Sequence, residues 1–318
     1  MGAELPVERR YEAIRLAAQR AAEKGVTTVH ALEGGNRDDE PELRCLMAGD
    51  LPVRVVPYPI TEDVEWVKSL GLPRIGGCLL LDGAIEAHTA ALFEPYADAP
   101  GELGKLYHTR EELAQFVRSA HDAGLQIAVH AVGERAIQQF LDVLEPVLVR
   151  SPRDHRHRIE HFIVPTADQI ARVARLGVAV CAQPTFERLW GGEQGGFARR
   201  LGPSRMKRTT PLRSLLDAGA LVAGGSDSYV SPLDPLLGIH SAVNHPNPAQ
   251  RLTVPEALRL FTLHAARIAF EDHLKGSLEV GKLADFVVLA RNPLVVAPNR
   301  LKDLEVLKTY VGGSKVAP

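Results

Sequence analysis

The sequence predicts an α/β protein: a TIM-like (β/α)8 barrel that lacks its first strand, followed by a small C-terminal β-sandwich portion. Two observations lead to this fold. Seven short apolar runs alternate with amphipathic helical patterns, which is typical of βα units around a parallel sheet. After about Phe270 the pattern changes to turn-rich β runs. We therefore place the barrel at residues 1–272 and the sandwich portion at residues 273–318.

The expected strands are rich in β-branched residues and almost continuously apolar, as suits strands that are buried on both faces. They span residues 26–30, 53–58, 78–82, 126–130, 158–162, 178–182 and 220–227. A closed parallel barrel normally has about eight strands, whereas this chain opens on an amphipathic helix, Pro6 to Lys24. We expect the missing strand to lie upstream of Met1, or the barrel to close in another way.

Three of the helices between these strands carry start signals. Each has a Thr three residues before a Glu or Gln, the spacing of a capping box: Thr109 with Glu112, Thr166 with Gln169 and Thr253 with Glu256. Gly124 and Gly177 follow the first two helices as terminators. We expect the third to run as one long helix through residues 253–270.

Composition excludes several classes of function. The net charge is −2 with both signs interspersed, so no basic surface points to nucleic acid or to anionic lipid. No apolar stretch approaches the roughly 20 residues that span a bilayer. The three cysteines, Cys45, Cys78 and Cys181, are too few for a disulfide framework and fit a reducing compartment. We expect a cytoplasmic protein that acts on a small molecule.

Three residues of metal-ligand type stand at the ends of expected strands: His130, His161 and Asp227. In a parallel barrel the carboxyl ends of the strands converge on one face, where active sites lie. Taken singly, such a His is often structural, and such an Asp is often a cap or a turn former. Together, two imidazoles and a carboxylate can hold a divalent metal, most simply zinc, and activate water. The trio therefore predicts a metal-dependent hydrolase.

Five segments in order along the chain carry a family resemblance: LLLDGAIEAHTAAL, IAVHAVGERAI, HRIEHF, VAGGSDSYVSPLDPL and GSLEVGKLADFVVL. With them the chain resembles the metal-dependent amidohydrolase superfamily, in the branch related to N-substituted formamide deformylases. The resemblance implies that His130 and His161 are metal ligands. It also implies that Asp227 takes a proton from metal-bound water and passes it to the leaving amine.

Two features depart from that family pattern. Relatives open the barrel with a His-x-His pair. The only such pair in this sequence, His155 and His157, precedes the sixth strand of the family barrel, so we interpret it as a chance match that does not bind the metal. Many relatives also carry a Lys in the strand before Asp-Gly. Cys78 lies near that position, and a thiolate is a competent zinc ligand, although a buried Cys is more often a small apolar residue. His30, which ends an expected strand, is a further candidate ligand.

Weaker expectations concern the surroundings of the site. Asp82, His88, Trp190 and His240 are candidate substrate-binding residues, because they lie on or beside loops at strand ends. Arg158 and Glu160 are expected to form an ion pair behind the site.

The leading function is hydrolysis of an amide or formamide-like C–N bond by metal-activated water. One alternative is a catalytically impaired or non-catalytic homologue that acts as a scaffold or subunit. Another is deamination of a small heterocycle. An open barrel leaves unpaired strand edges, so we also expect a homo-oligomer, with the first helix covering part of the open seam.

Overall fold

The computed structural model describes residues 6–32 and 40–318 of the chain. Strands occur in all seven places that the sequence predicts. They are β1 (Thr28–Ala31), β2 (Arg54–Pro57), β3 (Arg74–Leu80), β4 (Gln126–Ala131), β5 (Arg158–His161), β6 (Ala179–Ala182) and β7 (Val222–Gly224). All pairings among them are parallel, which agrees with a barrel built from βα units.

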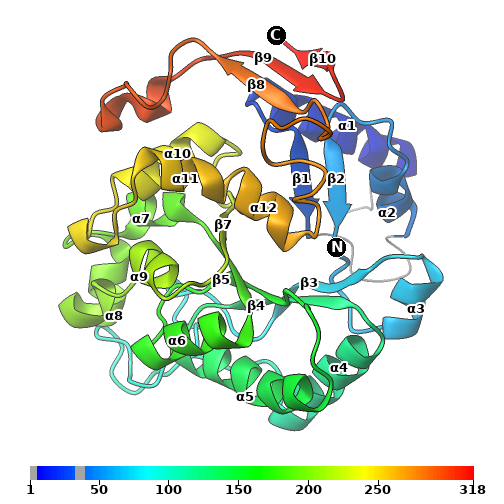
Figure 1. The fold of residues 1–318 in the computed structure, drawn as a ribbon. Coiled ribbons are helices and arrows are strands. Elements are labelled where there is room, and N and C mark those ends of the chain that lie inside the picture. The colour runs from blue at the N-terminus through cyan, green and yellow to red at the C-terminus, as the bar shows by residue number, and fades with distance from the viewer. Residues whose placement is uncertain (1–5, 33–39) are drawn as a thin grey trace.

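Helices connect the strands and cover the outside of the five-stranded sheet β3–β7 (Figure 1). The α-helices of the described residues are α1 (Val7–Glu23), α2 (Glu40–Met47), α3 (Val64–Ser69), α4 (Arg110–Asp122), α5 (Glu134–Arg150), α6 (Ala167–Leu176), α7 (Pro184–Trp190), α8 (Gly196–Met206), α9 (Leu212–Asp217), α10 (Pro235–Val243), α11 (Val254–Leu260) and α12 (Leu263–Ile268), of which α1 and α2 lie beside β1 and β2 instead. All three predicted capping boxes form, at the starts of α4, α6 and α11. Gly177 ends α6 with a left-handed φ of 69°, the conformation that favours glycine.

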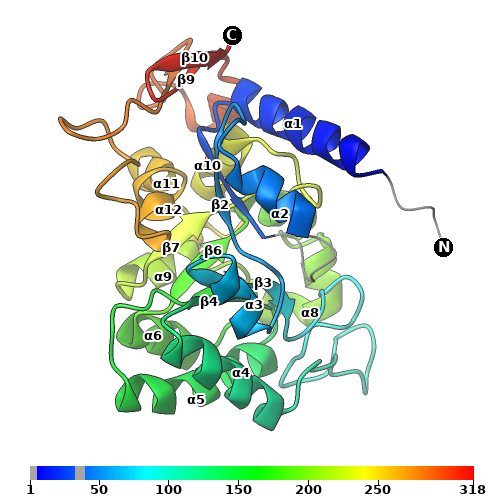
Figure 2. The same ribbon diagram turned by 90° about the vertical axis from the view of Figure 1, so that its right-hand side faces the viewer.

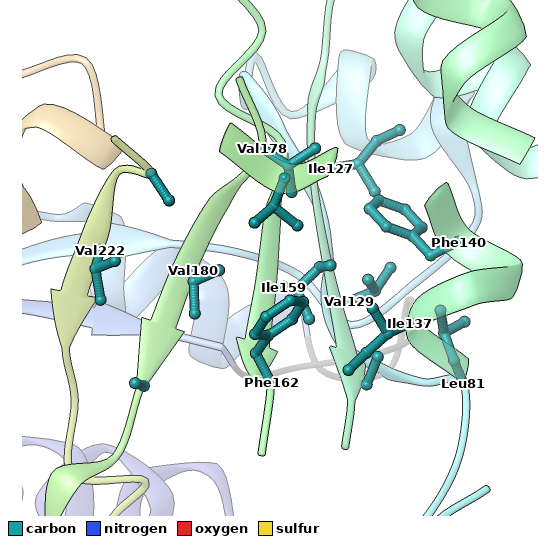
Figure 3. Packing of buried hydrophobic residues seen from close by; sticks show 14 of the residues in the cluster. Leu81, Ile127, Val129, Ile137, Phe140, Ile159, Phe162, Val178, Val180 and Val222 are labelled. Atoms are coloured by element: carbon teal, nitrogen blue, oxygen red, sulfur yellow. The ribbon is translucent and has the colours of Figure 1, made fainter. Parts of the chain in front are cut away.

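The main core lies between the five-stranded sheet and its helices. Alternate residues of neighbouring strands point to this side, and α5 meets them with Ile137 and Phe140 (Figure 3). The strand residues in this layer include Ile127, Val129, Ile159, Val180 and Val222. The opposite face of the strands points into the barrel. There a smaller cluster contains Val56, Tyr58 and Ala128.

The sequence predicts one gap in the barrel, where the first strand is missing. The structure instead divides the barrel strands into two separate sheets. β1 pairs with β2, and β3 to β7 form a separate sheet. In the described part of the chain no pairing joins β2 to β3 or β7 to β1. One physical reason lies in β3, where Gly76 and Gly77 both have a left-handed φ and the register with β4 shifts. The homo-oligomer expected at such open edges stays a prediction.

The predicted last long helix is wrong in one respect, because it divides into α11 and α12. The division falls at Phe261 and Thr262, where Thr262 leaves the helical conformation. The Phe261 ring packs so closely on Gly224 of β7 and Gly238 of α10 that neither position has room for a β-carbon. Tertiary packing of this one ring therefore overrides the helical pattern of the sequence.

The C-terminal region forms a three-stranded antiparallel sheet in the order β10-β9-β8. Its strands are β8 (Phe286–Leu289), β9 (Val306–Val311) and β10 (Ser314–Ala317), and the short 3-10 helix η3 (Pro298–Asp303) lies between β8 and β9. A second 3-10 helix, η2 (Pro248–Gln250), lies in the barrel between α10 and α11. Helix α1 lies beside this sheet in Figures 1 and 2, where Thr309 Oγ1 donates a hydrogen bond of 2.7 Å to the Ala22 carbonyl. Among the described residues, no helix is both long enough and apolar enough to cross a membrane.

Three buried histidines form a hydrogen-bonded group on the side of the barrel where β4 and β5 begin. His121 Nδ1 and His157 Nε2 are 2.9 Å apart. The remaining ring nitrogens bond to backbone groups of Ile127, Ser151, Leu176 and His157. Because the Ile127 amide donates to His157 Nδ1, the proton of His157 must sit on Nε2. The group is therefore satisfied with all three rings neutral, and the His155-x-His157 pair lies apart from the candidate ligands.

This group predicts a loss of stability in mild acid. Burial lowers the pKa of His155 to about 4 and also lowers the pKa values of His121 and His157. The unfolded rings titrate near 6.5, so below that pH the unfolded state binds more protons than the folded state. The unfolding free energy is expected to fall with decreasing pH by up to about 1.4 kcal/mol per pH unit for each ring. Urea denaturation between pH 7 and pH 5 measures this slope.

A variant isolates the contribution of the group from that of the other histidines. His157→Gln removes one titrating ring, so its unfolding free energy should depend less steeply on pH than that of the parent chain. Equal slopes for the two proteins would contradict the assignment.

Candidate metal centre

Cys78, His130 and His161 come together at the carboxyl ends of β3, β4 and β5. One potential ligand atom from each residue lies within 4.8 Å of the other two. Cys78 Sγ is 3.9 Å from His130 Nδ1 and 3.9 Å from His161 Nε2. The two histidines are buried, while Cys78 is partly exposed. Of the candidate ligands considered from the sequence, these three are the ones whose ligand atoms the structure brings together.

The His161 ring is held by a residue that the sequence analysis did not single out. Its Nδ1 lies 2.8 Å from Gln183 Oε1, while the Gln183 amide nitrogen donates to the Cys181 carbonyl. Because that bond turns the Gln183 oxygen toward the ring, His161 must donate from Nδ1. Its Nε2 then carries a lone pair directed toward Cys78.

His130 is held in the complementary way. Its Nε2 lies 3.2 Å from the Gly83 carbonyl and 3.6 Å from Asp82 Oδ1, so Nε2 carries the proton. The free lone pair is therefore on Nδ1, which faces Cys78. Histidine ligands of metals usually donate their other ring N–H to a carbonyl or carboxylate in this manner. Both rings thus present a free nitrogen to the thiol.

Backbone conformation at the end of β5 also serves this arrangement. In a regular strand His161 would share the face of Ile159, which packs in the helix-side core. His161 instead has a φ of 74°, in the left-handed region, and the following Phe162 has a φ of 51°. This break in alternation lets the His161 ring face Cys78. Such backbone costs on the order of 1–3 kcal/mol at a non-glycine residue and is concentrated at functional sites.

Asp227 lies just beyond β7 and is half-buried, again with a left-handed φ of 52°. Burial raises the pKa of its carboxyl group above the usual range, while His130 lowers it and Glu160 raises it further. Burial also raises the pKa of the Cys78 thiol, with smaller contributions from Glu160 and Asp227. Asp227 thus interacts electrostatically with His130 and with the Cys78 thiol.

Arg158 and Glu160 form the predicted ion pair. It is buried and bidentate, with Arg158 Nε 2.5 Å from Glu160 Oε1 and Nη2 2.8 Å from Oε2. Arg158 also donates to His30 Nδ1 at 3.0 Å and lies over the Tyr58 ring, 4.8 Å from its centroid. Within the described residues, His30 is thus engaged with Arg158 and is not part of the group around Cys78.

Asp82 has no exposed surface and orders the loop that follows β3. Its oxygens accept hydrogen bonds of 2.8–2.9 Å from the backbone N–H groups of Ala91, Val132 and Gly133. Burial raises the pKa of Asp82 to about 7, although these three donors oppose the rise. The carboxylate therefore supports His130 from behind, and the structure gives it no surface for direct contact with a substrate.

The other candidate substrate-binding residues are dispersed. His88 Nε2 pairs with Asp98 Oδ1 at 2.9 Å on the loop after β3. Trp190 packs edge-on against Phe186, whose ring in turn stacks on His161 with a centroid distance of 6.1 Å. His240 is buried on α10, which packs against η3 at Pro298 to Asp303. Trp190 is thus connected to the centre through one ring, while His240 faces the C-terminal region.

The donor set fits a divalent metal such as zinc. Sulfur and nitrogen ligands of one tetrahedral zinc lie about 2.3 and 2.0 Å from the ion, hence roughly 3.5 Å from each other. The Cys78 Sγ distances of 3.9 Å are close to that value, and both ring tautomers leave a lone pair free. Thiolate and imidazole are typical zinc ligands.

Comparison with known proteins identifies the family of the chain. A family model described as the amidohydrolase family matches residues 1–317. The putative amidohydrolase YtcJ of Bacillus subtilis is 33% identical over 335 residues, covering 98% of this chain and 62% of that protein. The N-substituted formamide deformylase of Arthrobacter pascens is 32% identical over 218 residues, covering 66% of this chain and 40% of that protein.

Solved structures lead to the same group. The crystal structure of an uncharacterized metal-dependent hydrolase from Pyrococcus furiosus superimposes with a TM-score of 0.80 at 29% identity, covering 92% of this chain and 62% of that one. The chain thus spans less than two thirds of the length of these relatives. With its parallel βα units, its strand-end histidines and a family match over almost every residue, the chain belongs to the amidohydrolase family.

Proposed function

We propose that this chain forms the catalytic barrel of a metal-dependent hydrolase that cleaves an amide or formamide-like C–N bond. The observation that carries the proposal is the grouping of Cys78, His130 and His161, each with a ligand atom turned toward the others. Relatives include a protein named for deformylation of N-substituted formamides, which is hydrolysis of a C–N bond. The zinc-type ligand set and the family agree on this class of reaction.

In this proposal Cys78, His130 and His161 hold the metal, most suitably zinc. The bound ion supplies Lewis acidity, which polarises the scissile carbonyl and makes water easier to deprotonate. Gln183 and the Gly83 carbonyl fix the two imidazole tautomers, so the nitrogens are in place before the ion arrives. Because the pKa of the Cys78 thiol is raised, the thiol is protonated when free, so binding of the cation would release a proton.

Asp227 carries the proton in the proposed reaction. In the metal-free protein burial raises the pKa of this carboxyl group, which favours uptake of a proton by Asp227. The carboxylate accepts a proton from water as the oxygen bonds to the carbonyl carbon. It then returns that proton to the nitrogen as the C–N bond breaks, which yields a carboxylate or formate and a free amine.

The test combines metal content with product analysis. The chain is loaded with Zn²⁺ or Co²⁺, dialysed and analysed for bound metal, and then incubated with N-alkylformamides while amine and formate are measured. The expected result is stoichiometric metal, hydrolysis of the formamide, and a thiolate-to-cobalt absorption band that the Cys78→Ser variant lacks. Metal without formamide hydrolysis, but with ammonia from a heterocyclic amine, would favour the deaminase alternative. Absence of both metal and turnover would favour the non-catalytic alternative.

A further inference from the structure

A cavity of about 590 Å³ adjoins the candidate metal centre. It is lined by Ile60, Cys78, Leu79, Leu80, Tyr107 and His108. Cys78 belongs both to this lining and to the group of three candidate ligands, so the cavity begins where the metal would be held. Its volume falls within the range of about 300–1,000 Å³ that is usual for small-molecule sites.

The walls of the cavity present large apolar side chains to solvent. Leu80, at the end of β3, is 48% exposed, and Tyr107, on the loop before α4, is 41% exposed. Ile60 and Leu79 complete the apolar lining. Uncovered apolar side chains that meet in a concave surface beside a reactive centre are typical of a binding site, whereas scattered ones are ordinary.

His108 adds little polarity to this wall. Its Nε2 lies 2.8 Å from Glu62 Oε1, and its Nδ1 is buried without a hydrogen-bond partner among the described residues. The polar atoms of the ring are therefore either paired or shielded from solvent. Apart from the Tyr107 hydroxyl and the Cys78 thiol, the lining therefore offers a ligand apolar surface rather than hydrogen-bonding groups.

We propose that this cavity is the subsite for an apolar substituent, an alkyl or aryl group, on the amide substrate. The inference rests on the proposed function and adds the class of substrate to it. Each methylene group buried in such a subsite contributes about 0.8 kcal/mol. A polar substituent would lose its hydration there and could gain little beyond the Tyr107 hydroxyl in return, so it would be disfavoured. Selectivity for amides with hydrophobic substituents follows.

The kinetic test uses two homologous series on the metal-loaded chain. One lengthens the alkyl group on nitrogen, from N-methylformamide to N-hexylformamide, and the other lengthens the acyl group of N-methylamides. The expected result is that kcat/KM rises about fourfold per methylene in one series, until the cavity is filled. The series that responds tells which side of the amide enters the cavity. No dependence on length in either series, with hydrolysis intact, would overturn the subsite and leave the proposed function standing.

Variants place the effect in the cavity. Leu80→Ser and Tyr107→Ser should each flatten the dependence on chain length. The matched control is Leu16→Ser, because Leu16 is also a half-exposed leucine, 52% exposed, but lies on α1 outside the lining. That control should retain the slope of the parent chain. If both cavity variants keep a dependence on chain length as steep as that of the parent chain, the proposal is overturned.

A binding measurement makes the test independent of turnover. Saturation-transfer NMR on the metal-free chain compares N-hexylformamide with N-methylformamide. The subsite is supported if N-hexylformamide binds to the parent chain and Leu80→Ser weakens that binding. This result would hold even if no amide were hydrolysed and the proposed function failed. Equal signals for the parent chain and for Leu80→Ser would count against it.

Discussion

Replacement of Asp227 by asparagine is expected to lower kcat for amide hydrolysis by about 10²–10⁴-fold, with bound metal close to the parent level. The reason is that asparagine keeps the size of the side chain but can neither accept the proton of water nor return it to nitrogen. Asp227 also stands outside the group of three residues whose ligand atoms lie within 4.8 Å of each other. Its loss should therefore remove proton transfer rather than metal binding.

The measurement is kcat together with metal content after dialysis, for Asp227→Asn and for the control Asp217→Asn. Asp217 is a suitable control because it is an exposed residue at the end of α9, paired with Arg213. A pH profile adds a second readout. If Asp227 is the base, the acidic limb of the kcat/KM profile that the parent chain shows should be lost or shifted in Asp227→Asn and unchanged in Asp217→Asn. Loss of metal in Asp227→Asn would instead make Asp227 a ligand, and unchanged turnover would remove it from the chemistry.

The barrel strands could be predicted because their signals are local. A buried parallel strand needs a short apolar, β-branched run, and each of the seven runs is a strand in the structure. Capping boxes are equally local, since one side chain bonds a backbone group three residues away. The break between α11 and α12 depends instead on Phe261 meeting Gly224 and Gly238, which are distant in sequence. No pattern within the helix indicates that contact.

The candidate centre was partly predictable for a related reason. His130 and His161 follow from the rule that parallel strands present their ends to one face. The same rule offers His30, but a buried arginine, Arg158, holds that ring, and only the folded chain shows this contact. Cys78 could not be assigned from sequence, because a cysteine in an apolar strand looks the same whether it packs or binds metal.

Gln183 was missed because amide side chains are rarely considered as part of a metal centre. A signal for it exists in the chain. Gln183 directly follows β6, so it stands at a strand end as His130 and His161 do. A search of all polar residues at strand ends, rather than of metal-ligand types alone, would have included it. Supporting residues that orient ligands are commonly amides, carboxylates or backbone carbonyls.

Removal of the Arg158 guanidinium is expected to have the largest effect on stability. Arg158 is 1% exposed, and it forms both hydrogen bonds of the buried pair with Glu160. Burial alone would lower the pKa of Arg158, but the neighbouring Glu160 more than offsets this and raises it well above its usual value. Arg158→Met leaves Glu160 without its partner in the barrel interior. The expected loss is about 3–5 kcal/mol of unfolding free energy, as for other buried pairs from which one charge is removed.

Urea denaturation of two variants distinguishes a lost partner from lost packing. Arg158→Met keeps an unbranched side chain but leaves the buried Glu160 carboxylate without its partner. Arg158→Met combined with Glu160→Met removes both charges. Since the destabilisation comes from the unpaired carboxylate, the double variant should recover much of the loss. If both variants lose the same free energy, the contacts of the guanidinium with His30 and the Tyr58 ring contribute more than the ion pair does. If Arg158→Met causes no measurable loss of unfolding free energy, water must reach Glu160. The barrel interior would then be more open than the burial of Arg158 and Glu160 indicates.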